Sequence, residues 1–132
     1  MTDLVISDIA LAPPEMVRHA TRDLAAAVAE TPSFTAFEQA AAAFRQDETV
    51  QRAIQAYQQK QQSLQLMLML NAVSPEDRAE LNRLYQAFAT QPSVVTYIQA
   101  EADVRELCQS VADRLSYYIG VDFAVACGSG CC

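Results

Sequence analysis

The chain contains no tryptophan, three glycines and five prolines among its 132 residues. A sheet protein built from many short strands uses glycine and proline often in its turns, and its strands are rich in β-branched and aromatic residues. This chain is instead rich in alanine and glutamine, which favour helices. The composition therefore predicts an all-α protein.

Positive charge is also scarce, with nine Lys and Arg residues against sixteen Asp and Glu, a net charge of -7 and a pI of about 4.5. An acidic surface repels nucleic-acid phosphates and anionic lipid headgroups, so we expect no direct nucleic-acid binding. The longest apolar stretch, residues 64–70, is too short to span a bilayer, and the first residues lack the basic region of a signal peptide. We expect a cytoplasmic protein with no membrane segment.

Enzyme signatures are missing as well, since there is no glycine-rich phosphate loop, no nucleophile elbow and no His-Glu-x-x-His pattern. The one histidine, His19, falls on a predicted helix, where an ordinary surface or boundary role is the simplest interpretation. We therefore predict that the protein is not an enzyme, with no catalytic residue to assign.

Apolar residues make up 52% of the chain and charged residues 19%, which is enough apolar surface for one globular core. Residues 1–120 are predicted to form a single helical domain, in which residues 1–13 are a loosely docked N-terminal arm. Residues 121–132 follow as a flexible, cysteine-rich tail. In a reducing cytosol these cysteines are expected to be thiols or metal ligands rather than disulfides.

Helix starts are marked by a capping residue or a proline at 13–14, 31–32, 47, 74–75 and 91–92. About five helices follow from these starts, the third running from residue 47 to 70 and the last ending at Gly120. Because the connections are short, we expect an antiparallel helical bundle or a long helical hairpin.

Residues 64–70 are apolar nearly all round the predicted helix, so both faces need cover, from the protein's own core or from a second subunit. We expect a homodimer, or a heterodimer with a related chain. The preceding glutamine-rich run, residues 58–62, reads as a solvated helix surface or as a partner contact.

The tail carries three cysteines, Cys127, Cys131 and Cys132, among glycines that allow a short loop to wrap closely around a metal. Thiolates bind Zn and iron–sulfur clusters, but such sites usually take four protein ligands. The fourth is Cys108, a partner chain or a donor such as the terminal carboxylate. Cys108 lies beside the apolar stripe of the last helix, which is typical of a small buried hydrophobe.

Two other interpretations of the tail stay open. It is an ordinary disordered terminus with exposed thiols, or, because it ends in Cys-Cys, a doubly prenylated tail. The second is disfavoured, since the chain has neither a phosphate loop nor a basic cluster before the cysteines.

Four segments together resemble the YlbF/YmcA family of small bacterial regulators: ATRDLA at 20–25, FTAF at 34–37, Asp47-Glu48, and QPSVVTYIQAE at 91–101. The resemblance implies an all-helical adaptor without catalytic residues, which assembles with itself or a family paralogue. In the understood branch, members join a complex that guides an endoribonuclease, RNase Y, in mRNA processing, with effects on competence, biofilm formation and sporulation. That complex carries iron–sulfur clusters of the 4Fe–4S type on cysteines, and the ligand group implied here is Cys127, Cys131 and Cys132.

Three functions are thus carried forward. The chain is a regulatory adaptor, a metal or redox sensor in which cluster or Zn occupancy is the signal, or a structural homodimer with a dispensable tail and no metal.

Overall fold

The computed structural model describes residues 14–126 and 128, and within these residues all regular structure is helical. The prediction of an all-α protein is confirmed. The helices are α1 (Pro14–Ala29), α2 (Pro32–Gln46), α3 (Glu48–Ser63), α4 (Gln65–Met69), α5 (Pro75–Ala89), α6 (Pro92–Ile119) and α7 (Phe123–Ala126).

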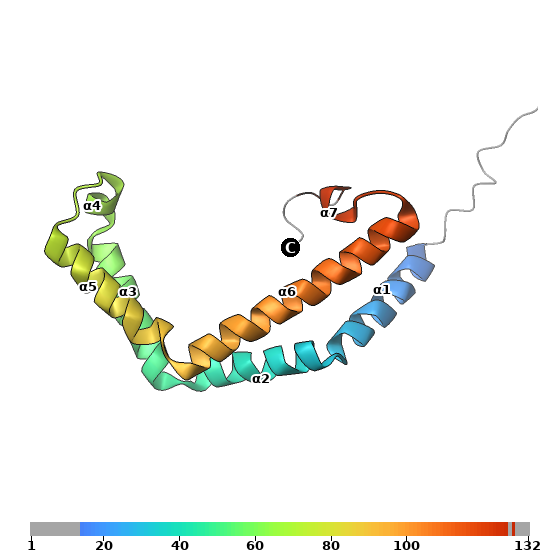
Figure 1. The fold of residues 1–132 in the computed structure, drawn as a ribbon, viewed down its shortest axis with the longest axis horizontal. Coiled ribbons are helices and arrows are strands. Elements are labelled where there is room, and N and C mark those ends of the chain that lie inside the picture. The colour runs from blue at the N-terminus through green and yellow to red at the C-terminus, as the bar shows by residue number, and fades with distance from the viewer. Residues whose placement is uncertain (1–13, 127, 129–132) are drawn as a thin grey trace, which may run out of the picture.

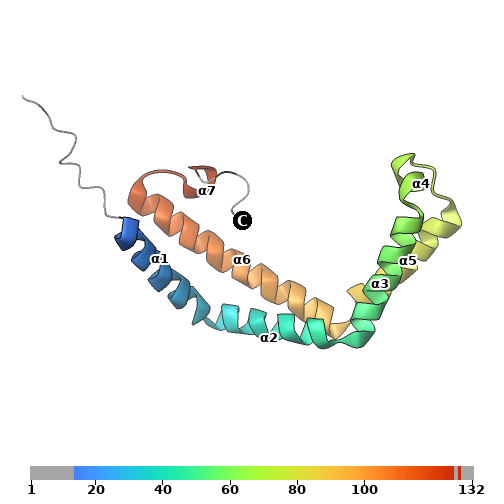
Figure 2. The same cartoon turned by 180° about the vertical axis from the view of Figure 1, so that it is seen from behind.

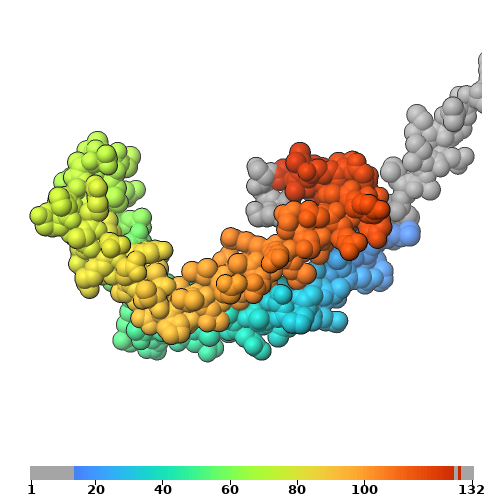
Figure 3. Space-filling model, in the orientation of Figure 1, coloured from blue at the N-terminus to red at the C-terminus, as the bar shows by residue number. Residues whose placement is uncertain are grey.

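The helices form two arms that meet at an angle (Figures 1 and 2). In the long arm, α1 and α2 run along α6, and α7 folds back at the far end of α6. In the short arm, α3 packs against α5, and α4 lies at the free end. Each arm is built on an antiparallel helix pair, α2 with α6 and α3 with α5, and Figure 3 shows open space between the arms. The helices thus form two joined hairpins.

Helix boundaries follow the local capping chemistry that the sequence predicts. The Thr31 side chain accepts a hydrogen bond from the Phe34 N–H at 3.3 Å, and Ser74 accepts one from the Asp77 N–H at 3.1 Å. Each satisfies a helix N–H that has no backbone partner. At the end of α6, Gly120 has φ 70°, a left-handed conformation that a glycine adopts without strain.

The predicted third helix differs from the structure, because it is broken at Leu64 rather than continuous to residue 70. The Leu64 N–H is shared between the carbonyls of Lys60 and Gln61. One turn of helix, α4, follows, and it ends with Asn71 at φ 51°, where the Ala72 N–H bonds back to the Met67 carbonyl at 2.8 Å. This is a Schellman-type helix end. The short helix α7, within the predicted tail, was likewise not expected.

Aromatic side chains hold each arm together. In the long arm, the Tyr97 ring of α6 lies 5.0 Å from the Phe44 ring and 5.7 Å from the Phe37 ring of α2, centroid to centroid. In the short arm, Tyr57 of α3 meets the edges of two α5 rings, Tyr85 at 6.0 Å and Phe88 at 5.6 Å. Such pairs contribute beyond the apolar area they bury. Each arm therefore has its own small core.

The buried core is sparse for a chain of this length. Among the described residues, the only large side chain buried completely is Val50, at 0% exposure. Three of the other buried residues, Ala100, Ala40 and Ala41, come from the α2–α6 pair, where small side chains permit close helix approach. Two joined helix pairs cannot enclose a thick interior. Much apolar surface consequently stays open.

The junction of the arms, which we call the elbow (residues 46–51 and 89–94), is fixed by one carboxylate. Asp47 accepts the Val50 N–H at 3.1 Å, which caps α3, and its other oxygen accepts the Ser93 hydroxyl at 2.7 Å, which reaches the first turn of α6. The Gln51 amide donates to the Phe44 carbonyl at 2.9 Å across the α2–α3 bend. These hydrogen bonds thereby link the α2–α3 connection and the α5–α6 connection, the two places where the chain passes from one arm to the other.

Candidate functional site

The cysteines predicted as metal ligands, Cys127, Cys131 and Cys132, lie outside the described residues. Cys108 is described, and it is exposed rather than buried. The expectation of a core position for Cys108 is wrong, because this position beside the apolar stripe falls on a face of α6 that no neighbouring helix covers. Its thiol is therefore open to solvent and to a ligand.

The chain turns back at Gly120 toward the middle of α6. The Ser116 hydroxyl accepts the Phe123 N–H at 2.9 Å, and this bond holds α7 against α6. Gln109 and Asp113 line an open cavity of about 730 Å³ together with residues of the turn and α7. Among residues 14–126 and 128, no group of three His, Cys, Asp or Glu side chains is arranged to hold a metal.

The free end of the short arm exposes five consecutive apolar side chains. We call residues 66–70 the tip. The exposed fractions are 68% for Leu66, 49% for Met67, 42% for Leu68, 78% for Met69 and 67% for Leu70. The sequence predicted that residues 64–70 need cover, and in the single chain Leu64 receives it whereas residues 66–70 stay exposed. Contiguous exposed apolar side chains are typical of interaction sites in soluble proteins.

The surroundings of the tip are polar without being charged, since residues 61–75 contain no Asp, Glu, Lys or Arg. Gln61, Gln62 and Gln65 line a hollow of about 550 Å³ together with Leu68 and Met69. Apolar centres with a hydrogen-bonding rim and few charges are typical of protein interfaces. The glutamine run, predicted as solvent surface or partner contact, thus borders the tip.

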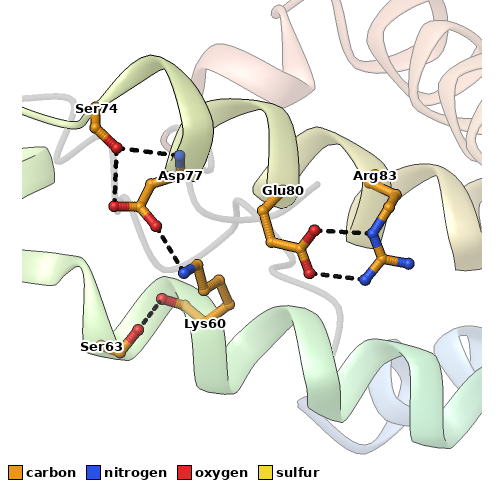
Figure 4. Close-up of polar contacts among 6 residues, drawn as sticks. All are labelled: Lys60, Ser63, Ser74, Asp77, Glu80 and Arg83. Atoms are coloured by element: carbon orange, nitrogen blue, oxygen red, sulfur yellow. Dashed lines mark hydrogen bonds and ion pairs between the residues drawn. The ribbon is translucent and has the colours of Figure 1, made fainter.

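One ion pair anchors the base of the tip. Lys60 of α3 donates to an Asp77 oxygen on α5 at 2.7 Å, and the other Asp77 oxygen accepts the Ser74 hydroxyl at 3.0 Å (Figure 4). The two flanking helices are thereby clamped where the tip emerges. The neighbouring pair, Glu80 and Arg83, lies within α5 and does not link the helices.

A second apolar surface lies at the far end of the long arm, between α1 and α6. This groove is lined by Leu24, Ser110, Val111, Arg114, Leu115 and Tyr118, and its volume is about 370 Å³. No residue of α1 is fully buried, although Met16, Ala20, Leu24 and Val28 form the apolar stripe that the sequence predicted. The stripe therefore has only a partial cover.

His19 has no special surroundings. Its Nε2 atom lies 3.5 Å from an Asp23 oxygen one turn further along α1, and both side chains are largely exposed. This agrees with the interpretation as a surface histidine.

We expect stability to fall when the pH drops below about 4. The Ser93 hydrogen bond holds the pKa of Asp47 below its ordinary value, and the Lys60 hydrogen bond does the same for the pKa of Asp77. A carboxylate with a lowered pKa stabilises the fold fully above its unfolded-state pKa, about 3.9, and this contribution is lost as the pH falls through the folded-state pKa. Thermal melts between pH 7 and 3 measure the effect. Asp47→Asn and Asp77→Asn should each flatten the acid dependence, whereas melts as steep as those of the parent would contradict the assignment.

Among the described residues, no helix is long and apolar enough to cross a membrane. Comparison with protein families gives a match to the family described as control of competence regulator ComK, YlbF/YmcA, over residues 17–119. No curated protein and no solved structure matches the chain.

Proposed function

Since the chain belongs to the YlbF/YmcA family of competence-control regulators, we propose that it is a non-enzymatic adaptor that acts by binding other proteins in the cytoplasm. The observation that carries this proposal is the tip, where five consecutive apolar side chains lie uncovered on a clamped support. A preorganised apolar surface costs less to bind than one that must first be ordered.

The partners that suit this surface are a second copy of the chain, a family paralogue, or an RNase-associated complex that processes mRNA. The adaptor itself does not touch the RNA, because a net charge of -7 opposes phosphate binding. Any effect on transcripts is exerted through the partners.

The proposed cofactor of the tail is an iron–sulfur cluster or, failing that, Zn. The donor chemistry fits such a group, since Cys127, Cys131 and Cys132 supply three thiolates and the exposed Cys108 supplies a fourth candidate within the chain. A bound cluster would supply a redox-sensitive metal centre. If occupancy of the tail by a cluster or Zn is the signal, the chain is a metal or redox sensor. If the tail is dispensable, the chain is a structural homodimer.

Self-association is the first test of the adaptor function. We expect the purified protein at micromolar concentration to be a dimer in light scattering, because pairing removes apolar tip surface from water at about 25 cal/mol per Å². The control variant Ile98→Lys changes an exposed apolar residue near the elbow and should leave the mass unchanged. A monomeric protein that also finds no paralogue partner would overturn the proposal.

A further inference from the structure

The tip and the groove lie at opposite ends of the molecule, at the free end of the short arm and the far end of the long arm (Figures 1 and 3). The tip is a protruding turn of helix with large exposed side chains. The groove is a hollow between two helices, lined by Leu24, Val111, Leu115 and Tyr118 with two other residues. The tip projects, the groove is hollowed, and both are mainly apolar, yet one chain of this shape cannot bring them together.

We propose that the groove receives the tip of a second copy of the chain, and that the contact is made twice about a twofold axis. This inference rests on the self-association proposed above and specifies the surfaces that carry it. The tip of each copy lies in the groove of the other, so that both surfaces of both copies are covered.

The size of the surfaces favours a copy over an unrelated partner. A stable interface buries roughly 800 Å² on each partner, or about 20–30 residues a side. One tip of five residues in one groove falls well short of that area. A twofold dimer doubles the contact without any further surface, whereas a foreign protein that binds the tip alone leaves the groove open. Tip-to-tip pairing would also leave both grooves uncovered.

The distribution of charged residues also favours a second copy of the chain as the partner at the groove. Two copies with a net charge of -7 repel each other, so they associate best where acidic residues are absent. Residues 61–75 have no charged side chain, and the one charged residue of the groove is Arg114, whose sign is opposite to the net charge. Neither surface therefore places an acidic side chain at this contact.

Symmetry decides whether such a contact closes. A knob-and-pocket contact between copies gives a ring or an open fibre when it is made once per pair, and a closed dimer when it is made reciprocally. A closed dimer has a fixed mass at all concentrations above its dissociation constant, which makes the two cases separable.

The test is complementation between two variants at exposed positions. The tip variant carries Leu66→Lys and Met69→Lys, and the groove variant carries Leu24→Glu and Tyr118→Glu. In each variant alone both contacts of the dimer are damaged, so the dissociation constant should rise about tenfold or more by analytical ultracentrifugation. In a 1:1 mixture, one contact is of parental type and the other pairs Lys with Glu, so dimers should return. Far-UV circular dichroism checks that both variants keep their helices.

Each outcome is decisive. Recovery in the mixture, with parental behaviour of Ile98→Lys, supports the reciprocal contact. If only the tip variant loses the dimer, the chains pair tip to tip. If only the groove variant loses the dimer, another helix lies in the groove. Either result overturns the inference. A parent dimer unaffected by both variants also overturns it while leaving self-association intact. A parent chain that is monomeric removes the self-association on which the inference rests.

Discussion

Val50→Asp is expected to abolish the cooperative helical fold. Val50 is completely buried at the elbow, where its backbone N–H bonds to Asp47 and its side chain has no contact with water. An unpaired charge at such a site costs several kcal/mol, a large part of the roughly 5–15 kcal/mol that stabilises a typical domain. Because the rest of the core is thin, other contacts cannot compensate. The measurement is helicity and the thermal transition by circular dichroism at neutral pH.

The matched control for this change is Val95→Asp. Val95 lies next to the elbow on the first turn of α6 but is 54% exposed. Its substitution should change the free energy of unfolding by no more than about 0.5 kcal/mol. Equal melts for the two aspartate variants would show that the elbow is not the structural centre of the molecule.

Replacing Cys127, Cys131 and Cys132 by serine is expected to abolish metal content while helicity and thermal stability stay nearly unchanged. The capped end of α6 at Gly120 and the hydrogen bond from Phe123 to Ser116 are formed without these thiols, so the described fold does not depend on them. Serine hydroxyls are poor ligands for iron–sulfur clusters. Anaerobic purification followed by absorbance and metal analysis measures the loss. A triple-serine protein with the metal content of the parent would refute the tail as the ligand set.

Cys108→Ser separates the sources of the fourth ligand. If the exposed Cys108 thiol completes the set, its loss lowers metal content in the otherwise intact chain. If a partner chain or the terminal carboxylate completes it, the single variant keeps the parental metal content. Since Cys108 is not part of the buried core, neither result is obscured by unfolding.

The helix starts were predictable because their causes are local. The Thr31 and Ser74 hydroxyls and the Asp47 carboxylate accept hydrogen bonds from N–H groups three residues further along. The same applies to Gly120, whose left-handed conformation ends α6. Spacing alone placed the aromatic residues on the inner face of α2, where Phe37 and Phe44 meet Tyr97.

Features that depend on distant parts of the chain were not predictable. The break at Leu64 occurs where α3 leaves the cover of α5, and periodicity, which continues through residue 70, gives no sign of it. The exposure of Cys108 depends on the rotation of α6 about α2, and the groove depends on how far α1 stands from α6. The capping pattern predicted a hydrogen bond to one carboxylate oxygen of Asp47. The other oxygen accepts the hydroxyl of Ser93, 46 positions away, and no local pattern indicates that contact.

The elbow also bears on how the chain finds its fold. The short arm is inserted between α2 and α6, so the ion pair of Lys60 and Asp77 spans 17 positions, whereas the contact of Asp47 with Ser93 spans 46. Closing the shorter loop costs less chain entropy, and rates of folding fall as contacts become more distant in sequence. Once α3 and α5 have packed into the short arm, Asp47 at the start of α3 and Ser93 after the end of α5 lie close together. We expect the long arm then to assemble as an almost local event, so that the hairpin that presents the tip would be the nucleus for the helices on either side of it.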